Sequence, residues 1–143
     1  MQHDGTDDFS GLDLVEGVLR GLGSQDAVLD RRGVNAESWF TDWSGLLKGA
    51  DVYIGIMWAS TGSRTARLLL DDWVFEDVPM NSLGDLIAHV FNGTAAIKSR
   101  LTFFRRSRIL ALEVPVDGGL CVSQRRAGVS EELSRWELRL TVE

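Results

Sequence analysis

The chain has 143 residues, 44% of them hydrophobic, and a formal net charge of −6 at neutral pH. This length suffices for one domain that buries roughly two-thirds of the surface exposed by its unfolded chain. A single cysteine, Cys121, excludes an internal disulfide, and the two histidines do not complete a zinc site built from Cys and His alone. No apolar run reaches the ~20 residues of a membrane span, and the N-terminus is acidic and polar. We therefore expect a cytoplasmic protein with no membrane contact, metal or cofactor.

The N-terminal segment, residues 1–9, is rich in Asp and lacks apolar periodicity, which predicts a disordered acidic leader. The remainder, residues 10–143, is predicted to form a single α+β domain. A first helix is expected over residues 10–23, where four apolar residues recur at helical spacing: Leu12, Val15, Leu19 and Leu22. Gly17 and Gly21 lie inside this helix, so we expect either a close-packed neighbour or a marginal helix.

A second helix is predicted over residues 35–49, capped by its first residue and ended by its last, a glycine. At about 100° per residue its apolar side chains fall within an arc of roughly 120°; they are Ala36, Trp39, Phe40, Trp43, Leu46 and Leu47. The apolar run over residues 52–59 predicts a strand covered on both faces. A turn at residues 60–63 then leads into a second strand over 65–78, so these segments predict a hairpin.

A third helix has the clearest pattern in the chain. Ser82 is the predicted N-cap, Asp85 completes a capping box and Gly93 ends the helix. One face carries Leu83, Leu86, Ile87, Val90 and Phe91. Strands are expected after this helix over residues 95–104, 109–116, 120–124 and 135–142.

The last of these strands, residues 135–142, alternates apolar and polar residues without interruption. Its predicted inward positions are Trp136, Leu138, Leu140 and Val142. The element order is ααββαββββ. This order predicts an α+β fold with a mostly antiparallel sheet of about six strands and helices on one face.

The charges are divided unevenly along the chain. Residues 1–90 contain fifteen Asp/Glu against six Lys/Arg, whereas residues 91–143 contain six against nine. Within the second part lies a basic aromatic ridge, which we define as Lys98, Arg100, Phe104, Arg105, Arg106 and Arg108. Three interpretations are open: a solvated strand whose arginines pair with acids near Asp72 and Glu76, a surface for an acidic protein partner, or a nucleic-acid site.

A second candidate site is an aromatic pocket. The five tryptophans, Trp39, Trp43, Trp58, Trp73 and Trp136, fall on or near predicted buried faces. They pack a core, or they line a ligand pocket if the helices stand away from the sheet. His89 lies four residues after Asp85, so it is either a half-buried boundary residue or a proton-transfer group beside that pocket.

Lopsided charge and the lack of a nucleophile motif favour a non-catalytic protein-binding protein of the immunity-protein, antitoxin or secretion-chaperone type. We expect one protein partner, bound through the ridge, and homo-oligomers are compatible with this hypothesis. The alternative is a small-molecule binding protein or enzyme that uses the aromatic pocket. A single-stranded nucleic-acid binder is the third hypothesis, which the net charge of −6 opposes.

Overall fold

The computed structural model describes residues 5–35, 37–59, 64–102 and 106–142. Within these ranges it contains three α-helices, which are α1 (Gly5–Gly21), α2 (Leu83–Phe91) and α3 (Arg135–Leu140), and a short 3-10 helix, η1 (Met80–Ser82). Its eight strands are β1 (Arg32–Asn35), β2 (Ser38–Leu47), β3 (Ala50–Ala59), β4 (Thr65–Leu70), β5 (Trp73–Pro79), β6 (Ala96–Leu101), β7 (Ser107–Val116) and β8 (Gly119–Gly128). The α+β class and the antiparallel pairing are confirmed.

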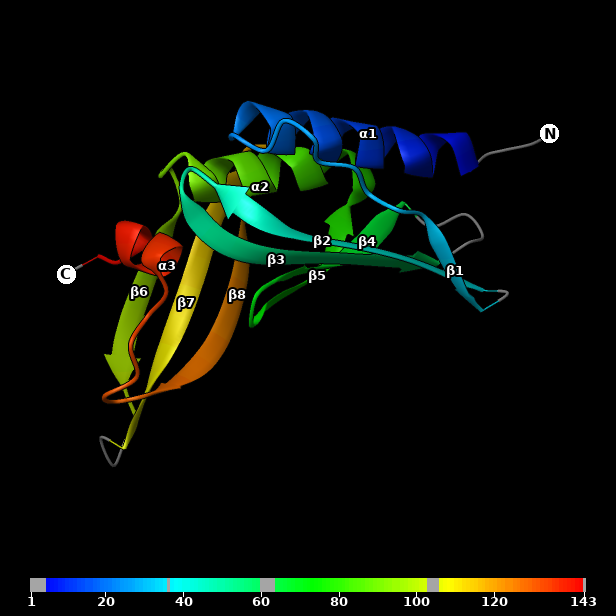
Figure 1. Ribbon diagram of the computed structural model, residues 1–143. Helices are drawn as coiled ribbons and strands as arrows, with labels where there is room; N and C mark the ends of the chain where they lie inside the picture. The colour runs from blue at the N-terminus through cyan, green and yellow to red at the C-terminus, as the bar shows by residue number, and fades with distance from the viewer. Residues whose placement is uncertain (1–4, 36, 60–63, 103–105, 143) are drawn as a thin grey trace.

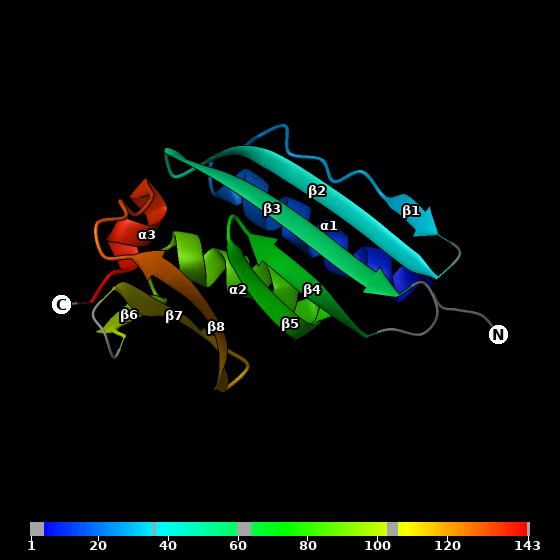
Figure 2. The same ribbon diagram turned by 90° about the horizontal axis from the view of Figure 1, so that it is seen from below.

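The strands form two sheets where the sequence predicted one. The first sheet has five strands in the order β1-β2-β3-β4-β5, and the second has three in the order β6-β7-β8. Helices α1 and α2 lie over one face of the first sheet, and the second sheet projects away from it at an angle (Figure 1). Seen from below, the five strands lie in front of both helices, so neither helix covers this face (Figure 2).

The predicted helix over residues 35–49 is wrong, because this segment forms the end of β1 and all of β2. Aromatic and β-branched residues favour a strand here, and strand alternation places Trp39, Thr41 and Trp43 on the face toward the helices. The terminal glycine ends a strand instead of a helix. Lys48 and Gly49 both have positive φ, of 51° and 81°, and form a two-residue hairpin turn between β2 and β3.

The predicted strand over residues 135–142 is also wrong, because residues 135–140 form α3. Ser134 and Glu137 form a capping box, in which each side chain satisfies the backbone N–H of the other residue. A helix places Trp136 and Leu140 on one face, since they are four residues apart. Leu138, predicted to point inward, is 61% exposed. The S-x-x-E spacing was the available signal for this helix.

Two smaller differences concern element boundaries. The strand predicted over 65–78 is divided into β4 and β5 by a two-residue turn, Asp71 and Asp72, in which Asp71 has a φ of 52°. Helix α1 begins at Gly5, inside the segment expected to be a disordered leader, of which residues 1–4 lie outside the described residues. The strand expected over 120–124 extends to Gly128.

Helix α1 approaches η1 at Gly11 and α2 at Gly84, two glycines to which the sequence pattern drew no attention. A Cβ atom on Gly11 would lie 2.7 Å from the carbonyl oxygen of Met80, and one on Gly84 would lie 3.3 Å from Val18. In contrast, a Cβ atom on Gly17 or Gly21 would meet no atom within 4 Å. The close-packing explanation for these last two glycines is therefore wrong. Close packing of the helical layer occurs at Gly11 and Gly84 instead, because glycine has no Cβ atom to prevent the approach.

The two sheets meet where β8 crosses the edge of β5. Here the Ser123 hydroxyl donates a hydrogen bond to the Val74 carbonyl oxygen at 2.7 Å and accepts one from the Val74 N–H at 3.1 Å. Ser123 is only 3% exposed. One side chain thus satisfies backbone groups at the edge of β5 that a neighbouring strand would otherwise pair.

We predict that Ser123→Ala lowers the free energy of unfolding by about 1–2 kcal/mol, because it removes both hydrogen bonds to the Val74 backbone. Urea denaturation measures this change. Ser44→Ala, at an exposed serine of β2, is the control and should change stability by less than ~0.5 kcal/mol. Equal stability of the two variants would show that the hydroxyl does not join the sheets.

Candidate functional site

The outer face of the second sheet carries three cationic side chains, which we call the basic face: Lys98, Arg100 and Arg126. Arg100 and Arg126 both pair in register with Ile109, on opposite sides of β7. Residues paired across antiparallel strands point to the same face, and Lys98 shares that face because it lies two residues before Arg100. Leu110, adjacent to Ile109, is buried in the core, so the basic face points away from the core.

The basic aromatic ridge is not one surface. Arg108 lies on the opposite face of the sheet from Arg100, and its Nη2 atom donates a hydrogen bond to the backbone carbonyl oxygen of Glu131 at 3.2 Å. Arg106 is exposed just before β7 begins. Phe104 and Arg105 lie outside the described residues. Of the predicted ridge, the structure therefore brings together only Lys98 and Arg100 among the residues that it describes.

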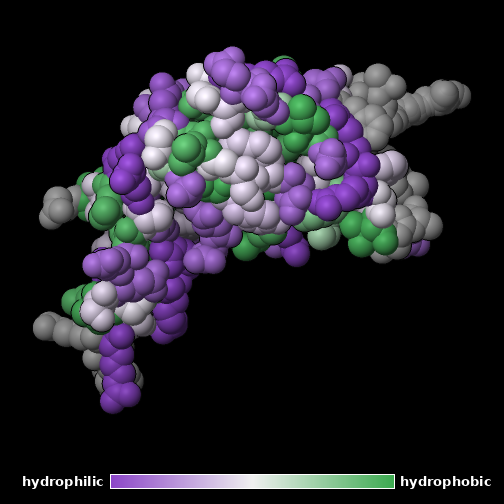
Figure 3. All heavy atoms as spheres, viewed as in Figure 1, coloured by the Kyte–Doolittle hydropathy of each residue, from purple (hydrophilic) through white to green (hydrophobic). Residues whose placement is uncertain are grey.

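The cations of the basic face are weakly neutralised. Lys98 forms an exposed ion pair with Glu113 at 3.1 Å, and Arg126 donates a hydrogen bond to the Ser107 hydroxyl at 3.1 Å. Arg100 forms no ion pair with another described residue. An exposed ion pair contributes about 0–1 kcal/mol, so the Lys98 ammonium remains available to a stronger partner. In the view of Figure 3, taken from the side on which α3 lies, the projecting sheet is also mostly hydrophilic.

Lys98 pairs with an acid across its sheet, as the first interpretation expected, but that acid is Glu113 and not one near Asp72 or Glu76. Glu76 pairs with Arg67 at 3.0 Å within the first sheet, and Asp72 lies in the turn between β4 and β5. Sequence reasoning also missed Arg126, because it ended the strand at residue 124. Continuing the period-2 alternation by two residues would have placed Arg126 on the outer face.

A buried polar network lies between the two sheets and is centred on the Glu137 carboxylate. Its Oε2 atom accepts hydrogen bonds from Trp73 Nε1 at 2.8 Å and from Arg125 Nη2 at 2.7 Å. Its Oε1 atom accepts one from the Ser134 N–H at 2.8 Å. Arg125 also lies over the Trp73 ring, 5.2 Å from its centroid, which is within the ~6 Å typical of a cation–π contact. α3 is thereby tied to both sheets.

These contacts set the charge state of the network. Burial raises the pKa of the Glu137 carboxyl, but hydrogen bonds from Ser134, Arg125 and Trp73 outweigh burial, so the net pKa lies below its ordinary value. Burial lowers the pKa of Arg125, and the hydrogen bonds to Glu137 and Glu131 reverse this, so its net pKa is raised. Both groups therefore stay ionised at neutral pH.

The same network forms one wall of an open depression of about 570 Å³. Its lining is mostly acidic: Tyr53, Asp71, Asp72, Arg125, Glu131, Glu132, Ser134 and Glu137. Asp71 is already engaged, since it accepts hydrogen bonds from Trp136 Nε1 at 2.7 Å and the Tyr53 N–H at 2.9 Å. Among the described residues, no group of three or more His, Cys, Asp or Glu side chains has an arrangement that could hold a metal ion.

The tryptophans proposed to line a pocket occupy the core and its border. Trp58, Trp73 and Trp136 are at most 3% exposed, and Trp39 and Trp43 are half-buried against the same cluster. The Trp39 and Trp58 rings stack, with centroids 6.3 Å apart. The core-packing interpretation accounts for all five positions.

His89 is half-buried near the end of α2. Its Nδ1 atom lies 2.6 Å from the Thr94 hydroxyl, which is also 3.1 Å from the His89 carbonyl oxygen. The ring is therefore held by the residues that follow its own helix. This placement agrees with a boundary residue, and Cys121 lies half-buried on a different element, β8.

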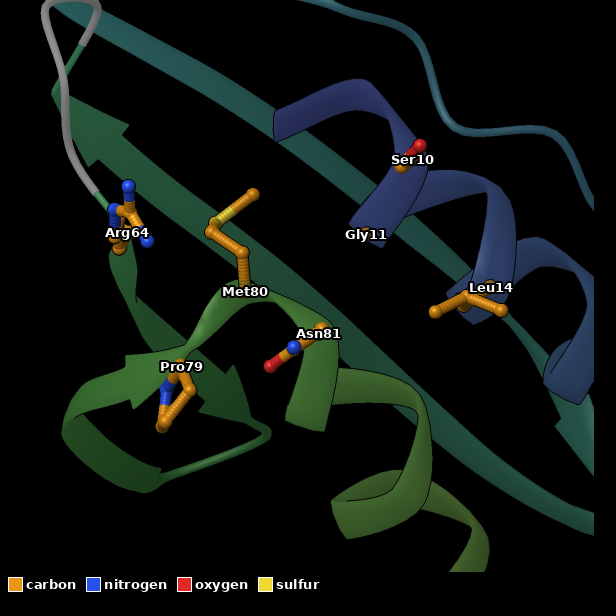
Figure 4. Close-up of a pocket in the computed structure, with 7 residues that line it drawn as sticks. All are labelled: Ser10, Gly11, Leu14, Arg64, Pro79, Met80 and Asn81. Atoms are coloured by element: carbon orange, nitrogen blue, oxygen red, sulfur yellow. The ribbon is translucent and has the colours of Figure 1, made fainter. Parts of the chain in front are cut away.

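A different pocket, of about 400 Å³, lies between α1 and the chain leading into α2 (Figure 4). Leu14, Pro79 and Met80 give it apolar walls, and the exposed Arg64 stands at one end. Gly11 and Met80, which both line it, approach each other closely. Sequence reasoning placed no site here, because the lining residues come from three separate segments.

Comparisons with known proteins add no relative. No family model, no curated protein and no solved structure matches this chain. Among the described helices, none is long and apolar enough to cross a membrane.

We predict that Glu137→Gln lowers the free energy of unfolding at pH 7 by about 3 kcal/mol, because it leaves the largely buried Arg125 guanidinium with only the more exposed Glu131 carboxylate among the described residues. The lowered pKa of Glu137 stabilises the fold above the unfolded value of about 4.3. This stabilisation is lost as the pH falls through the lower pKa that Glu137 has in the folded protein. The difference in free energy of unfolding between the wild type and the variant should therefore become smaller below pH ~4.3. Urea denaturation across this pH range measures it. The control is Glu132→Gln, at an exposed residue, and a similar loss there would contradict the assignment.

Proposed function

We propose that this chain is a non-catalytic protein-binding protein, of the immunity-protein, antitoxin or secretion-chaperone type, and that its basic face engages an acidic surface of one protein partner. The observation that supports this proposal is the composition of that face. Among the described residues it presents three cations against the single acid Glu113, on a chain with a net charge of −6.

The shape and chemistry of the face suit protein recognition. No described helix packs on it, and it is built on a rigid three-stranded ladder. The half-buried Ile109 lies between Arg100 and Arg126, so apolar surface separates two guanidinium groups. Arginine beside apolar surface is common in protein interfaces. The acidic remainder of the chain disfavours other orientations of an acidic partner, which adds specificity.

The same cations could bind phosphates, and charge alone does not separate the two classes of partner. Nucleic acid is disfavoured because the long polyanion would extend beyond three cations onto the acidic surface. An acidic patch on a protein is limited in area, so it need not extend beyond the three cations onto the acidic surface of this chain. A direct comparison of a polyglutamate peptide with an oligothymidylate of equal charge therefore distinguishes the two classes of partner.

We predict that a defined polyglutamate peptide binds the wild-type protein with an affinity that falls as salt is added. The double variant Arg100→Ser with Arg126→Ser should bind about tenfold more weakly, since two exposed charge contacts contribute about 1.4 kcal/mol together. Fluorescence anisotropy measures both. The matched control is Arg32→Ser with Arg67→Ser, which removes the same charge from the first sheet.

Equal weakening in the control would show that net charge, and not the basic face, determines binding. Tighter binding of an oligothymidylate of equal charge would favour the nucleic-acid hypothesis instead. Circular dichroism melts of both double variants should stay within a few degrees of wild type, because all four arginines are surface residues.

A further inference from the structure

Strand β6 has one unpaired edge. It is the outermost strand of the second sheet and pairs with β7 along its full length, from Ala96 with Glu113 to Leu101 with Arg108. On its other side, the described chain forms a strand-type pairing at Ile97. There Thr141 forms an isolated parallel bridge, and the Val142 N–H donates a hydrogen bond to the Ile97 carbonyl oxygen at 3.0 Å. This edge thus already accepts an extended segment.

The hydrogen bond at Ile97 shows which backbone groups face the open edge. In a strand, the N–H and C=O of one residue point to the same side, and successive residues alternate. Because the Ile97 carbonyl points outward, the backbone groups of Ser99 and Leu101 point outward too. The opposite set points to β7, as the bond from the Thr102 N–H to the Ser107 carbonyl oxygen at 2.9 Å confirms.

The side chains beside this edge differ between the two faces. All four residues from Lys98 to Leu101 are exposed. Lys98 and Arg100 belong to the basic face, whereas Leu101 points to the opposite face and is 49% exposed. A segment laid along the edge would meet two cations on one side and an apolar side chain on the other.

We propose, resting on the function proposed above, that the partner binds as an added β-strand along Ser99–Leu101 of β6. The partner segment is extended and alternates acidic with apolar residues. Its carboxylates lie beside Lys98 and Arg100, its apolar side chains cover Leu101, and its backbone pairs with the outward groups of Ser99 and Leu101. Strand addition supplies affinity through backbone hydrogen bonds and specificity through alternate side chains.

Charge decides between this occupant and a second copy of the chain. Two β6 edges placed side by side would bring Lys98 and Arg100 of one copy against those of the other, and like charges opposite each other are destabilising. Lysine and arginine on an open edge are a common protection against self-association. The same charges attract an acidic strand, so one feature excludes the second copy and selects the partner.

The test uses a blocked octapeptide of alternating Glu and Val. Ser99→Pro removes an outward N–H without removing a hydrogen bond to β7, so the sheet should form while peptide binding weakens at least tenfold. Ser99→Ala is the matched control and should bind as the wild type does. Isothermal titration calorimetry measures the affinities, and circular dichroism checks the fold.

A second peptide makes the result independent of the folding of Ser99→Pro. Methylation of alternate backbone nitrogens keeps the charges and blocks strand pairing, so this peptide should bind the wild-type protein at least tenfold more weakly. Equal binding of both peptides would overturn strand addition. Light scattering that shows a dimer broken by Ser99→Pro would assign the edge to a second copy and also overturn it.

The outcomes separate the two proposals. In one outcome, the Arg100→Ser and Arg126→Ser double variant no longer binds the octapeptide, whereas Ser99→Pro binds it as tightly as the wild type does and the methylated peptide binds as tightly as the unmethylated one. This outcome would support binding at the basic face and overturn strand addition. If the double variant binds both the octapeptide and polyglutamate as the wild type does, the proposed function itself fails.

Discussion

The Glu137 carboxylate is the interaction on which the arrangement of the two sheets depends. It accepts hydrogen bonds from Trp73 of the first sheet and Arg125 of the second, while its own helix α3 uses it as a cap. A buried carboxylate is costly unless charge and hydrogen bonds compensate it, and here every partner comes from a different element. Any change in the angle between the sheets would therefore leave a buried charge uncompensated.

This mode of joining leaves other surfaces free. The sheets meet through side chains, with the Ser123 hydroxyl in place of a backbone ladder, so the second sheet does not need its outer face or its β6 edge to hold its position. Only the inner face of the second sheet contributes to the core, through residues such as Ile97, Leu112 and Val114. The projecting sheet can consequently carry three cations without burying any of them.

The fold class and the third helix could be predicted from the sequence, because hydrophobic periodicity and the terminal Gly93 are local signals. The predicted capping box of Ser82 and Asp85 is wrong, because the Ser82 side chain makes no cap hydrogen bond and donates to Asp117 instead. The segments containing Trp39 and Trp136 were assigned to the wrong element, since a short apolar pattern fits both a helix and a strand. The aromatic residues of β2 were the signal that distinguishes this segment as a strand. The capping box at Ser134 was the signal that distinguishes α3 as a helix. Glu137 was expected in solvent, because a strand period places it opposite Trp136, and no local signal reveals a partner as distant as Trp73.

The candidate site was predictable to the same limited extent. The basic aromatic ridge defined from the sequence includes Lys98 and Arg100. Strand pairing, however, determines which cations share a face, and it adds Arg126 while placing Arg108 on the other side. Strand pairing also places β6 at the edge of its sheet, so its charged side chains lie beside unpaired backbone groups. On a central strand they would only attract a partner to a face, whereas beside open backbone groups they select which extended chain can complete the sheet.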